Sequence, residues 1–598
     1  MIIADLKSSF RPQMMPMLMF FAMLFVSWRR WTSLIVDIGR ETDLPLRLLN
    51  GEILYRDIHY TYTPFSPYFN AGLYWLFGIH IDTLAASGIV FSGILLLLCY
   101  RIFIRLMPAA ETAIAVSFIL VLCVFKPAGN LILPYSFGAL HAAVFALASL
   151  LFVLRHWETR KKRELIIAGI FIGFAALAKQ EFGFAGAVTV FAYVVYLHRA
   201  DFRRLFTDLF LSGISALAIV IPVFVVLFAK IDPNVLINDC HLFYTNIPES
   251  LVFYNRFRSG FDAPVGSFIQ MVGAAFLSAA IVSLIIWLSD RTGKLRKKSF
   301  ILFAISSGMV GIVLYFFINQ WDGSPLRAIP FFLLGIIFVE WRRRSRVNNN
   351  SAAVSDPDDN GALFVIAVFS IAILTRLILR VPSGGFAGSF YLPTSLGLIF
   401  FGLLVMLPNA VRKWSGDEIS YARSKFITRT ICVAAVVGVG FSFGYRYRSK
   451  YVYRIEAPRG TVFVEQHTGP ALDQAQKFIV SNTTPGEFIA VLPEGNDLGF
   501  LTARKIDLRH QVLLPAFLSE QDEFEAISAM QRDNVRYIFI VNRPMREFGS
   551  VAFGRDFYQT LGNWIETNFE VVEVFGESGN PNAEICNPPF FIKAYRRR

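Results

Sequence analysis

The sequence predicts a polytopic α-helical membrane protein with about 13 transmembrane helices and a small α/β domain at its C-terminal end. Its 598 residues are 55% hydrophobic and only 17% charged, and their mean hydropathy is +0.51. Soluble proteins carry about 25% charged residues, so a single water-soluble globule is excluded. The apolar residues fall into long runs, whereas residues 445–598 return to the composition of a soluble domain. These observations divide the chain into a membrane module, 1–444, and a soluble domain, 445–598.

A helix needs roughly 20 apolar residues to cross the hydrocarbon core of a bilayer. Thirteen runs are candidate spans: 13–30, 82–104, 110–126, 137–154, 164–178, 182–198, 208–229, 265–288, 299–318, 326–341, 361–378, 389–408 and 426–444. The first run begins after Arg11, ends at Arg29-Arg30 and has no small-residue cleavage site behind it. It is therefore expected to be a retained span rather than a signal peptide.

Short loops rich in Lys and Arg indicate the cytoplasmic side. With Lys7 and Arg11 in the cytoplasm, every second loop is basic, as in 155–163, 291–298 and 412–425. An odd number of spans then places residues 445–598 outside. The sequence thus predicts a multi-pass membrane protein with a cytoplasmic N-terminus and a C-terminal domain on the outer side. The polar segment 345–361 is expected to be a disordered cytoplasmic loop.

The net charge of +13 raises the question of a nucleic-acid partner. Residues 445–598 hold 18 Lys+Arg and 19 Asp+Glu, so the positive excess belongs to the membrane module and its cytoplasmic loops. No soluble part of the chain offers a basic patch, and nucleic acid is not an expected partner. The five cysteines form no C-x-x-C pair, which argues against a zinc ribbon.

The C-terminal segment alternates strand-like and helix-like stretches. Residues 487–492, 536–541 and 570–575 are short runs rich in β-branched and aromatic side chains, which suits strands. Ser519 followed by Asp522 predicts a capped helix through Met530, and a second helix is expected over 556–569. No glycine-rich phosphate loop is present in this sequence, so the domain is not an obvious nucleotide site.

The first outer loop, 31–82, is far longer than a connection requires, and such loops usually carry function. Asp37 and Glu41 are spaced i, i+4 and would share one face of a helix. Paired carboxylates at a membrane surface can share a proton, bind a cation or act as base and partner. The alternative is a solvated loop end in which Arg40 neutralises the acids.

The residues of this loop carry a family resemblance. The strings Asp37-x-Gly39-Arg40-Glu41, Gly51-Glu52-x-Leu54-Tyr55-Arg56-Asp57 and Pro64-x-Ser66-Pro67-Tyr68 resemble bacterial family-39-like membrane glycosyltransferases of the GT-C superfamily, relatives of protein O-mannosyltransferases and lipid A aminoarabinose transferases. Leu177-Ala178-Lys179-Gln180-Glu181 resembles the L-[AT]-K-x-E element of the same group. The resemblance covers the membrane module and the overall plan of the chain.

The resemblance implies an inverting hexosyl- or pentosyltransferase that moves a sugar from a polyprenyl-phosphate carrier to a lipid, polysaccharide or protein acceptor at the outer face. In such enzymes a carboxylate of the first loop is the general base, and here that residue is Asp37. A carboxylate so placed removes the proton of a weakly nucleophilic hydroxyl as the new bond forms. Several relatives carry adjacent Asp-Glu in this loop and another acid in the second outer loop. This chain departs on both counts, so Glu41 and Asp57 are the candidates for the supporting carboxylate.

Developing charge on the carrier phosphate requires cations, and Arg presents a planar fork that suits phosphate oxygens. Arg256 and Arg258, with Arg327 and Arg380, are favoured for contact with the carrier. Arg376 is expected at a helix end, where its side chain would simply reach toward the membrane surface. The residues predicted to contact substrate are Arg40, Asp57, Tyr60, Tyr135, Lys179, Glu181, Arg256, Arg258, Arg327 and Arg380. Lys179 and Glu181 have the alternative reading of a structural ion pair.

No cofactor is required by the sequence, although Asp37 and Glu41 offer oxygens that suit Mg²⁺ or Mn²⁺. Two other classes of function stay open. A secondary transporter or lipid flippase also has many spans and intramembrane charges, but no internal repeat at half length is found. A non-catalytic assembly protein would use the C-terminal domain to recruit partners.

Overall fold

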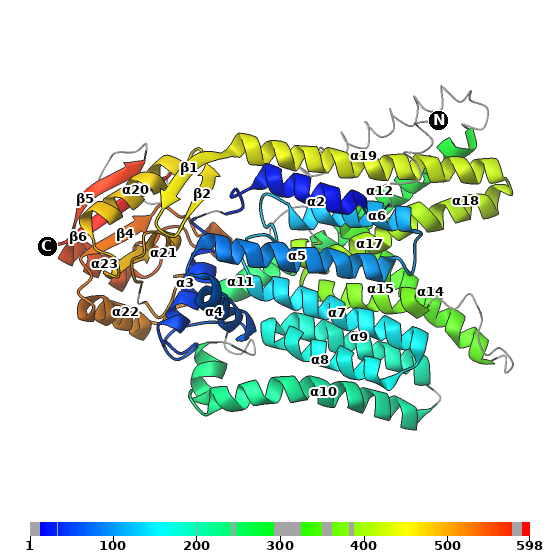
Figure 1. Cartoon of the computed structure of the whole chain (residues 1–598), viewed down its shortest axis with the longest axis horizontal. Helices are drawn as coiled ribbons and strands as arrows, with labels where there is room; N and C mark the ends of the chain where they lie inside the picture. The colour runs from blue at the N-terminus through cyan, green and yellow to red at the C-terminus, as the bar shows by residue number, and fades with distance from the viewer. Residues whose placement is uncertain are drawn as a thin grey trace.

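The computed structural model describes residues 12, 14–32, 34–36, 38–199, 201–240, 242, 247–291, 325–349, 361–381, 388–506, 508–576 and 589–598. Long helices lie side by side in a bundle, and a smaller domain that contains all the strands sits at one end (Figure 1). The last bundle helix runs along the bundle and leads directly into the first strand of that domain. We call this the domain end of the bundle and the opposite end the far end.

Most of the described chain up to residue 450 is helical. Its α-helices are α2 (Met14–Ser27), α3 (Ile38–Leu49), α4 (Phe65–Phe77), α5 (Ile81–Phe103), α6 (Ala109–Ile119), α7 (Phe137–Thr159), α8 (Lys162–Ala178), α9 (Gln180–His198), α10 (Phe202–Phe228), α11 (Glu249–Ser259), α12 (Pro264–Arg291), α14 (Ile329–Asn349), α15 (Gly361–Leu374), α16 (Gly388–Tyr391), α17 (Pro393–Phe401), α18 (Leu407–Ser415) and α19 (Glu418–Lys450). Short π- or 3₁₀-helical turns are η1 (Leu120–Val124), η2 (Val235–Asp239), η4 (Pro325–Ala328), η5 (Thr375–Leu377) and η6 (Gly402–Met406).

Seven helical stretches of the described residues are long and apolar enough to cross a membrane. They are Ile81–Phe103, Phe137–Thr159, Gln180–His198, Phe202–Phe228, Glu249–Trp287, Pro393–Ser415 and Glu418–Lys450. Shorter apolar helices cover Met14–Ser27, Ala109–Val124 and Gly361–Leu377. The chain is therefore a helical membrane protein. The expected span 299–318 and most of the expected loop 345–361 lie outside the described residues, and the number thirteen stays a prediction.

Small residues allow the helices to approach closely. A Cβ atom on Gly169 of α8 would lie 2.2 Å from the carbonyl oxygen of Ser212 in α10, and one on Gly88 of α5 would lie 1.8 Å from that of Ile132. Such contacts replace the hydrophobic driving force that is absent between helices in lipid. The close approach at Gly88 brings the segment 130–135 against α5 at the domain end.

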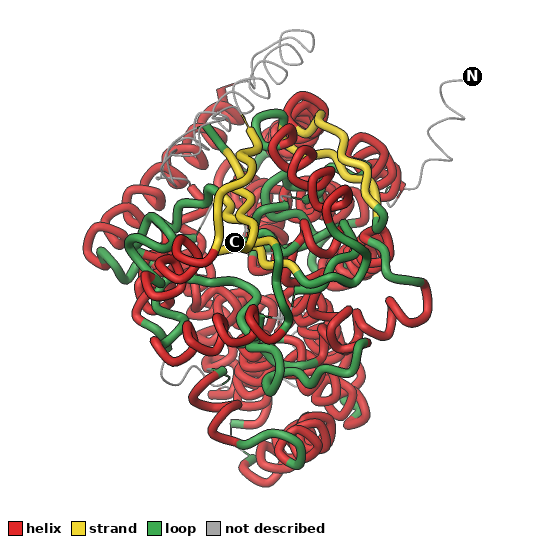
Figure 2. Tube along the Cα trace, turned by 90° about the vertical axis from the view of Figure 1, so that its left-hand side faces the viewer, coloured by secondary structure: helices red, strands yellow, loops and turns green. Residues whose placement is uncertain are grey.

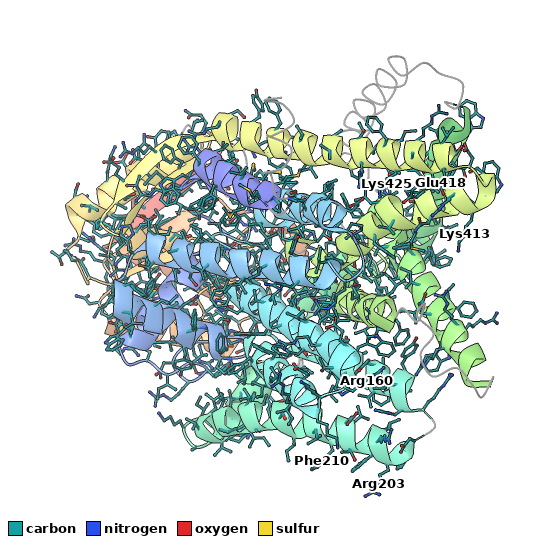
Figure 3. The ribbon with its side chains drawn as sticks, turned by 45° about the vertical axis from the view of Figure 1, so that its right-hand side comes forward. Arg160, Arg203, Phe210, Lys413, Glu418 and Lys425 are labelled. Atoms are coloured by element: carbon teal, nitrogen blue, oxygen red, sulfur yellow. The ribbon has the colours of Figure 1, made fainter. Side chains whose placement is uncertain are left out.

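Basic side chains gather at the far end of the bundle. Arg160, Arg203, Lys413 and Lys425 all lie there, away from the strands (Figure 3). Lys425 forms an ion pair of 3.5 Å with the buried carboxylate of Glu111, which also pairs with Arg429. The structure thus separates a strongly basic end from the end that carries the C-terminal domain.

The C-terminal segment folds around a four-stranded sheet in the order β3-β4-β6-β5. Its elements are β1 (Tyr451–Ala457), β2 (Gly460–Glu465), α20 (Gly469–Asn482), β3 (Ile489–Leu492), α21 (Asp497–Leu501), α22 (Glu520–Arg532), β4 (Tyr537–Val541), η7 (Arg546–Phe548), α23 (Gln559–Asn568), β5 (Phe569–Gly576) and β6 (Phe591–Arg597). Strands β3 and β4 are parallel and the other pairs antiparallel. Figure 2, which looks onto this end, shows the strands in front of the helical bundle. The residues of β4 are buried on both faces, because helices cover the sheet.

The three strand-like runs correspond to β3, β4 and β5, and the two helix-like runs to α22 and α23. Ser519 and Asp522 form a reciprocal capping box at the start of α22. The hairpin β1–β2, helix α20 and strand β6 were not anticipated. The antiparallel hairpin continues α19 beyond its last turn, so its strands follow a long helix without an intervening loop.

The first loop, 31–82, is folded rather than extended. It contains α3 and α4, and α3 lies with α21 of the C-terminal domain at the domain end. Nine of the twelve residues of α3 are buried, including the polar side chains of Glu41, Thr42, Asp43 and Arg47. Buried polar groups require partners, and those partners define the candidate site.

Candidate active site

The centre of the site is the junction between α8 and α9. Lys179 adopts an extended conformation that separates the two helices, and Glu181 lies in the first turn of α9. The Lys179 Nζ atom lies 3.4 Å from Glu181 Oε1, and the lysine side chain is almost completely buried. The helix break therefore points both charged side chains of the Lys-x-Glu element into one place. The lysine also lies over the ring of Tyr62, with 4.9 Å from Nζ to the ring centroid.

Glu181 binds two further side chains from the last third of the membrane module. Arg376 in η5 forms an ion pair of 2.9 Å with Glu181 Oε1, and Tyr391 in α16 donates a hydrogen bond of 2.5 Å to the same oxygen. Arg376 also donates to Asn255 Oδ1 of α11 over 3.3 Å. The carboxylate of Glu181 thus holds a lysine, an arginine and a tyrosine from three separate parts of the chain.

The first loop closes the other side of the site. Arg40 of α3 donates to Glu41 Oε1 and to the carbonyl oxygen of Tyr135, each over 3.1 Å. The backbone N–H of Phe137, at the start of α7, donates to Glu41 Oε2 over 3.0 Å. Because a helix N-terminus favours negative charge, α7 fixes the carboxylate of Glu41. The Arg40 guanidinium also faces the ring of Tyr62, so the tyrosine lies between Arg40 and Lys179.

Six of the predicted residues are therefore brought to one region: Arg40, Glu41, Tyr60, Tyr135, Lys179 and Glu181. Burial and the charge of Glu41 raise the pKa of Tyr60 well above its usual value, so this hydroxyl stays protonated. Tyr135 packs with 5.4 Å between its ring centroid and that of Phe390, the residue before Tyr391. Three cations and two carboxylates meet here among aromatic rings. Such a site can bind an anionic phosphate and orient a sugar beside it.

The C-terminal domain contacts the face of α3 that points away from the site. Thr42 donates to Asp497 Oδ1 over 3.2 Å, and Gln511 donates to Asp43 Oδ2 over 3.0 Å. A Cβ atom on Gly39 would lie 2.7 Å from the backbone nitrogen of Asp497, so only glycine permits this approach. Helix α3 thus turns Arg40 and Glu41 toward the site and turns Thr42 and Asp43 toward the domain.

This docking contact predicts a pH dependence of stability. Burial and the nearby carboxylates of Asp43 and Glu494 raise the pKa of Asp497 to about 8, and burial raises that of Asp43 to about 6. Carboxyl groups in unfolded chains titrate near 3.9. The stability that these protonated groups provide is therefore complete below about pH 4 and is lost as the pH rises toward 8. The other charged groups that act on Asp43 are Arg47, Glu52 and Arg459.

We expect the melting temperature of the purified protein to fall between pH 5 and pH 9, and Asp497→Asn to make this fall smaller by several degrees. The asparagine keeps an acceptor for Thr42 and carries no titratable proton. Scanning fluorimetry at matched ionic strength measures both profiles. Asp556→Asn, which removes a carboxylate from a local turn of the same domain, is the control. Parallel pH profiles for the wild type and Asp497→Asn would contradict the assignment.

Other predicted cations lie beside the site rather than in it. Arg380 forms an ion pair of 3.2 Å with Asp262 and donates to the carbonyl oxygen of Phe257 over 2.8 Å. These contacts tie the segment after η5 to α11. Arg380 is therefore held as part of the scaffold next to Arg376.

The remaining three arginines occupy different positions. Arg256 is exposed on α11, and Arg258 stacks its guanidinium on Tyr254 at 5.1 Å. Arg327 in η4 is buried and donates to Gln270 of α12. Asn255, the partner of Arg376, joins α11 to the Glu181 cluster by a hydrogen bond.

Asp57 has a local role in the first loop. Its carboxylate pairs with Arg56 at 2.8 Å and accepts from the backbone N–H of Ile53 over 2.7 Å, which closes a turn. These contacts lower the pKa of Asp57. Both Arg56 and Asp57 line a cavity of about 650 Å³ shared with the C-terminal domain, so a substrate contact by Asp57 stays a prediction for that surface.

Asp37, the expected general base, lies outside the described residues. Its chain neighbours Val36 and Ile38 line a cavity of about 190 Å³. Among the described residues no three His, Cys, Asp or Glu side chains form a group that could hold a metal ion. The two oxygens of Glu41 accept hydrogen bonds from the protein. The divalent cation suggested for Asp37 and Glu41 therefore stays a prediction.

Arg376 and Tyr391 were not among the residues predicted for the site. Arg376 was expected to reach toward the membrane surface, but it points to Glu181. An arginine inside an apolar run is a signal for a buried partner or cavity, and that signal was available. Tyr391 carried none, because a tyrosine at the start of an apolar run is equally typical of a membrane interface.

Comparisons with known proteins agree with this architecture. Residues 61–226, which include Lys179 and Glu181, match the family described as dolichyl-phosphate-mannose-protein mannosyltransferase. No curated protein matches the whole sequence significantly. Among solved structures, the oligosaccharyltransferase of Archaeoglobus fulgidus aligns with a TM-score of 0.50 and 13% identity over 95% of this chain and 72% of its own.

A second solved structure, ArnT from Cupriavidus metallidurans bound to undecaprenyl phosphate, aligns with a TM-score of 0.50 and 12% identity over 97% of both chains. At these identities the alignments establish the fold. The chain therefore has the fold of these two solved structures, and its residues 61–226 are similar to the mannosyltransferase family.

Proposed function

We propose that this protein is an inverting glycosyltransferase that moves a sugar from a polyprenyl-phosphate carrier to an acceptor hydroxyl at the outer face of a bacterial inner membrane. The observation that carries the proposal is the Lys179–Glu181–Arg376 cluster, which lies at the domain end and faces the first loop. The similarity to an ArnT structure bound to undecaprenyl phosphate supports a polyprenyl carrier.

In the proposed reaction the acceptor oxygen attacks the anomeric carbon of the donor sugar. The bond between that carbon and the phosphate oxygen breaks, and its electron pair leaves with the polyprenyl phosphate. Asp37 takes the acceptor proton. Lys179, Arg376 and Arg40 balance the charge that grows on the phosphate, because preorganised cations in a site with little water lower the barrier. Attack from the face opposite to the phosphate inverts the anomeric configuration.

Glu181 has a positioning role in this scheme. It fixes Lys179 and Arg376 through one oxygen, Oε1, so the two cations lie on the same side of the carboxylate. Glu41 similarly fixes Arg40. Tyr60 is protonated and can donate to a phosphate or sugar oxygen, whereas Tyr391 donates its hydrogen bond to Glu181. Glu181 and Glu41 thus hold cations in place, and Asp37 is the carboxylate that interacts with the acceptor.

The distribution of charge supports the orientation. Cytoplasmic loops are enriched in Lys and Arg, and the far end carries Arg160, Arg203, Lys413 and Lys425. The far end would then face the cytoplasm. The domain end, with the cluster and the C-terminal domain, would face the periplasm, where lipid-linked sugars are used.

The test is a transfer assay with the full chain in lipid nanodiscs. A mixture of undecaprenyl-phosphate sugars and an envelope extract as acceptor source is added, and mass spectrometry follows the release of undecaprenyl phosphate. We expect release to require the extract and to slow by about 10²–10³-fold after Lys179→Met. Uptake of the donor by proteoliposomes without cleavage of the sugar would instead support a transporter or flippase and would contradict the proposal.

A further inference from the structure

A second polar cavity lies beside the start of α3. It has a volume of about 190 Å³ and we call it the α19 pocket, because Arg446, Lys450 and the adjoining Tyr451 supply one wall. The other lining residues are Trp31, Thr32, Val36, Ile38, Pro127, Ala128, Gly129, Asn130, Leu133, Tyr135 and Glu465. None of the four cations assigned to the carrier in the sequence analysis lines this pocket.

The electrostatic environment of the α19 pocket is positive. Lys450 forms an ion pair of 2.8 Å with Glu465, and Arg446 also lines the pocket. The lining residues therefore carry two positive charges and one negative charge.

The lining of the pocket includes the buried hydroxyl of Thr32, which is available to a ligand. Thr32 is 2% exposed, and its Oγ1 atom makes no hydrogen bond within the described part of the chain. A buried polar atom without a partner is costly, and such an atom in a native structure points to a ligand or water. Thr32 Oγ1 can donate to an oxyanion that the cations of α19 attract.

The α19 pocket also borders the catalytic loop. Val36 and Ile38, the residues on either side of Asp37, both line it. Tyr135 lines it too, and the carbonyl oxygen of Tyr135 accepts from Arg40 of the cluster. A neighbouring cavity of about 240 Å³ shares Thr32, Val36 and Glu465 with the pocket and extends to Arg543 in the C-terminal domain. The two cavities therefore adjoin each other next to the C-terminal domain.

We propose that the α19 pocket binds an anionic group of the acceptor, a phosphate or a carboxylate, and that the acceptor is therefore an acidic glycan or lipid. This inference rests on the proposed function and names the acceptor class of that site. The anion sits between Arg446, Lys450 and Thr32, while the attacking hydroxyl of the same molecule reaches the first loop. The carrier phosphate is held separately by the cluster around Glu181.

The test measures anion binding without turnover. The full chain is placed in nanodiscs of phosphatidylcholine, and inorganic phosphate and acetate are titrated by calorimetry at low ionic strength. We expect Arg446→Gln with Lys450→Gln to weaken phosphate binding at least tenfold. The matched control is Arg203→Gln with Lys413→Gln, which removes two charges at the far end and leaves the binding constant unchanged.

A second variant separates ligand binding from folding. Thr32→Val has nearly the same shape and removes the unpartnered hydroxyl. We expect it to weaken phosphate binding several-fold while the melting temperature of the ligand-free protein does not fall, because no hydrogen bond is lost. A variant that binds phosphate as the wild type does would overturn the role of Thr32 and with it the proposal.

Competition identifies the source of the anion. Undecaprenyl phosphate is added at saturation, and we expect inorganic phosphate still to bind at the α19 pocket. Complete displacement would assign the pocket to the carrier and overturn the acceptor assignment, as would the absence of phosphate binding by the wild type. A chain that binds phosphate but never cleaves a lipid-linked sugar would overturn the proposed function instead, so the two failures are distinguishable.

Discussion

Replacing Lys179 by methionine should lower the turnover number of sugar transfer by about 10²–10³-fold, the usual cost of removing one preorganised donor from a developing oxyanion. Methionine preserves most of the volume and the apolar stem, and it removes the charge 3.4 Å from Glu181. If Lys179 acts only in the transition state, kcat and kcat/KM fall together. Steady-state kinetics with a lipid-linked sugar donor measures both.

The far end provides a matched control for this variant. Glu111 is buried and pairs with Lys425 and Arg429, as Glu181 pairs with Lys179 and Arg376. Lys425→Met therefore removes a comparable ion pair, and we expect it to change stability but not turnover.

The double variant Lys179→Met/Glu181→Gln tests whether Lys179 acts on the phosphate or only neutralises the charge of Glu181. Glu181 keeps Arg376 as a partner in Lys179→Met, and the double variant removes both charges of the Lys179–Glu181 pair. Recovery of turnover in the double variant would mean that Lys179 only neutralises Glu181. We expect the double variant to stay as slow as Lys179→Met, because the phosphate still lacks its cation.

The local part of the site was predictable from the sequence because it depends on neighbours in the chain. A lysine and a glutamate two residues apart, at the end of one apolar run and the start of the next, must emerge together when the helix breaks between them. The structure shows that break at Lys179. The same reasoning located the capped helix α22 from Ser519 and Asp522. In both places the spacing of residues fixes the geometry.

The distant part was not predictable, since it depends on packing between helices. Arg376 reaches Glu181 only because η5 lies beside α9, and no pattern in the sequence specifies that pairing. Likewise Asp43, Asp497 and Gln511 are unremarkable surface-type residues until α3 packs on the C-terminal domain and buries them. Contacts between segments more than 400 residues apart depend on the tertiary packing of the whole chain, which local sequence patterns do not specify.

The contact between α3 and the C-terminal domain links this domain to the candidate site. A soluble domain on a membrane enzyme can be a passive appendage, but here its residues 496–511 contact the face of α3 opposite to Arg40 and Glu41. Movement of the domain would shift both residues relative to Lys179. The domain is thus positioned to set the geometry of the first loop.

Replacing Asp37 by asparagine should lower the turnover number by about 10²–10⁴-fold, the range typical of a lost general base. The physical reason is that an acceptor hydroxyl holds its proton until the new bond is well advanced, and an amide cannot take it. Glu41 cannot substitute, because its carboxylate is fixed by Arg40 and by the N–H of Phe137. Transfer kinetics and a thermal melt of the same preparation measure activity and folding together.

Small carboxylates distinguish a missing base from a damaged loop. Asp37→Ala removes the whole carboxylate and leaves space for formate, which can accept the proton, so we expect formate to restore part of the turnover of Asp37→Ala. It should not restore Lys179→Met, which lacks a cation rather than a base. Glu573→Gln, an exposed carboxylate on β5, is the control for charge removal. Full activity of a folded Asp37→Asn protein would show that the base is another residue, and Glu41→Gln would then be the next variant to measure.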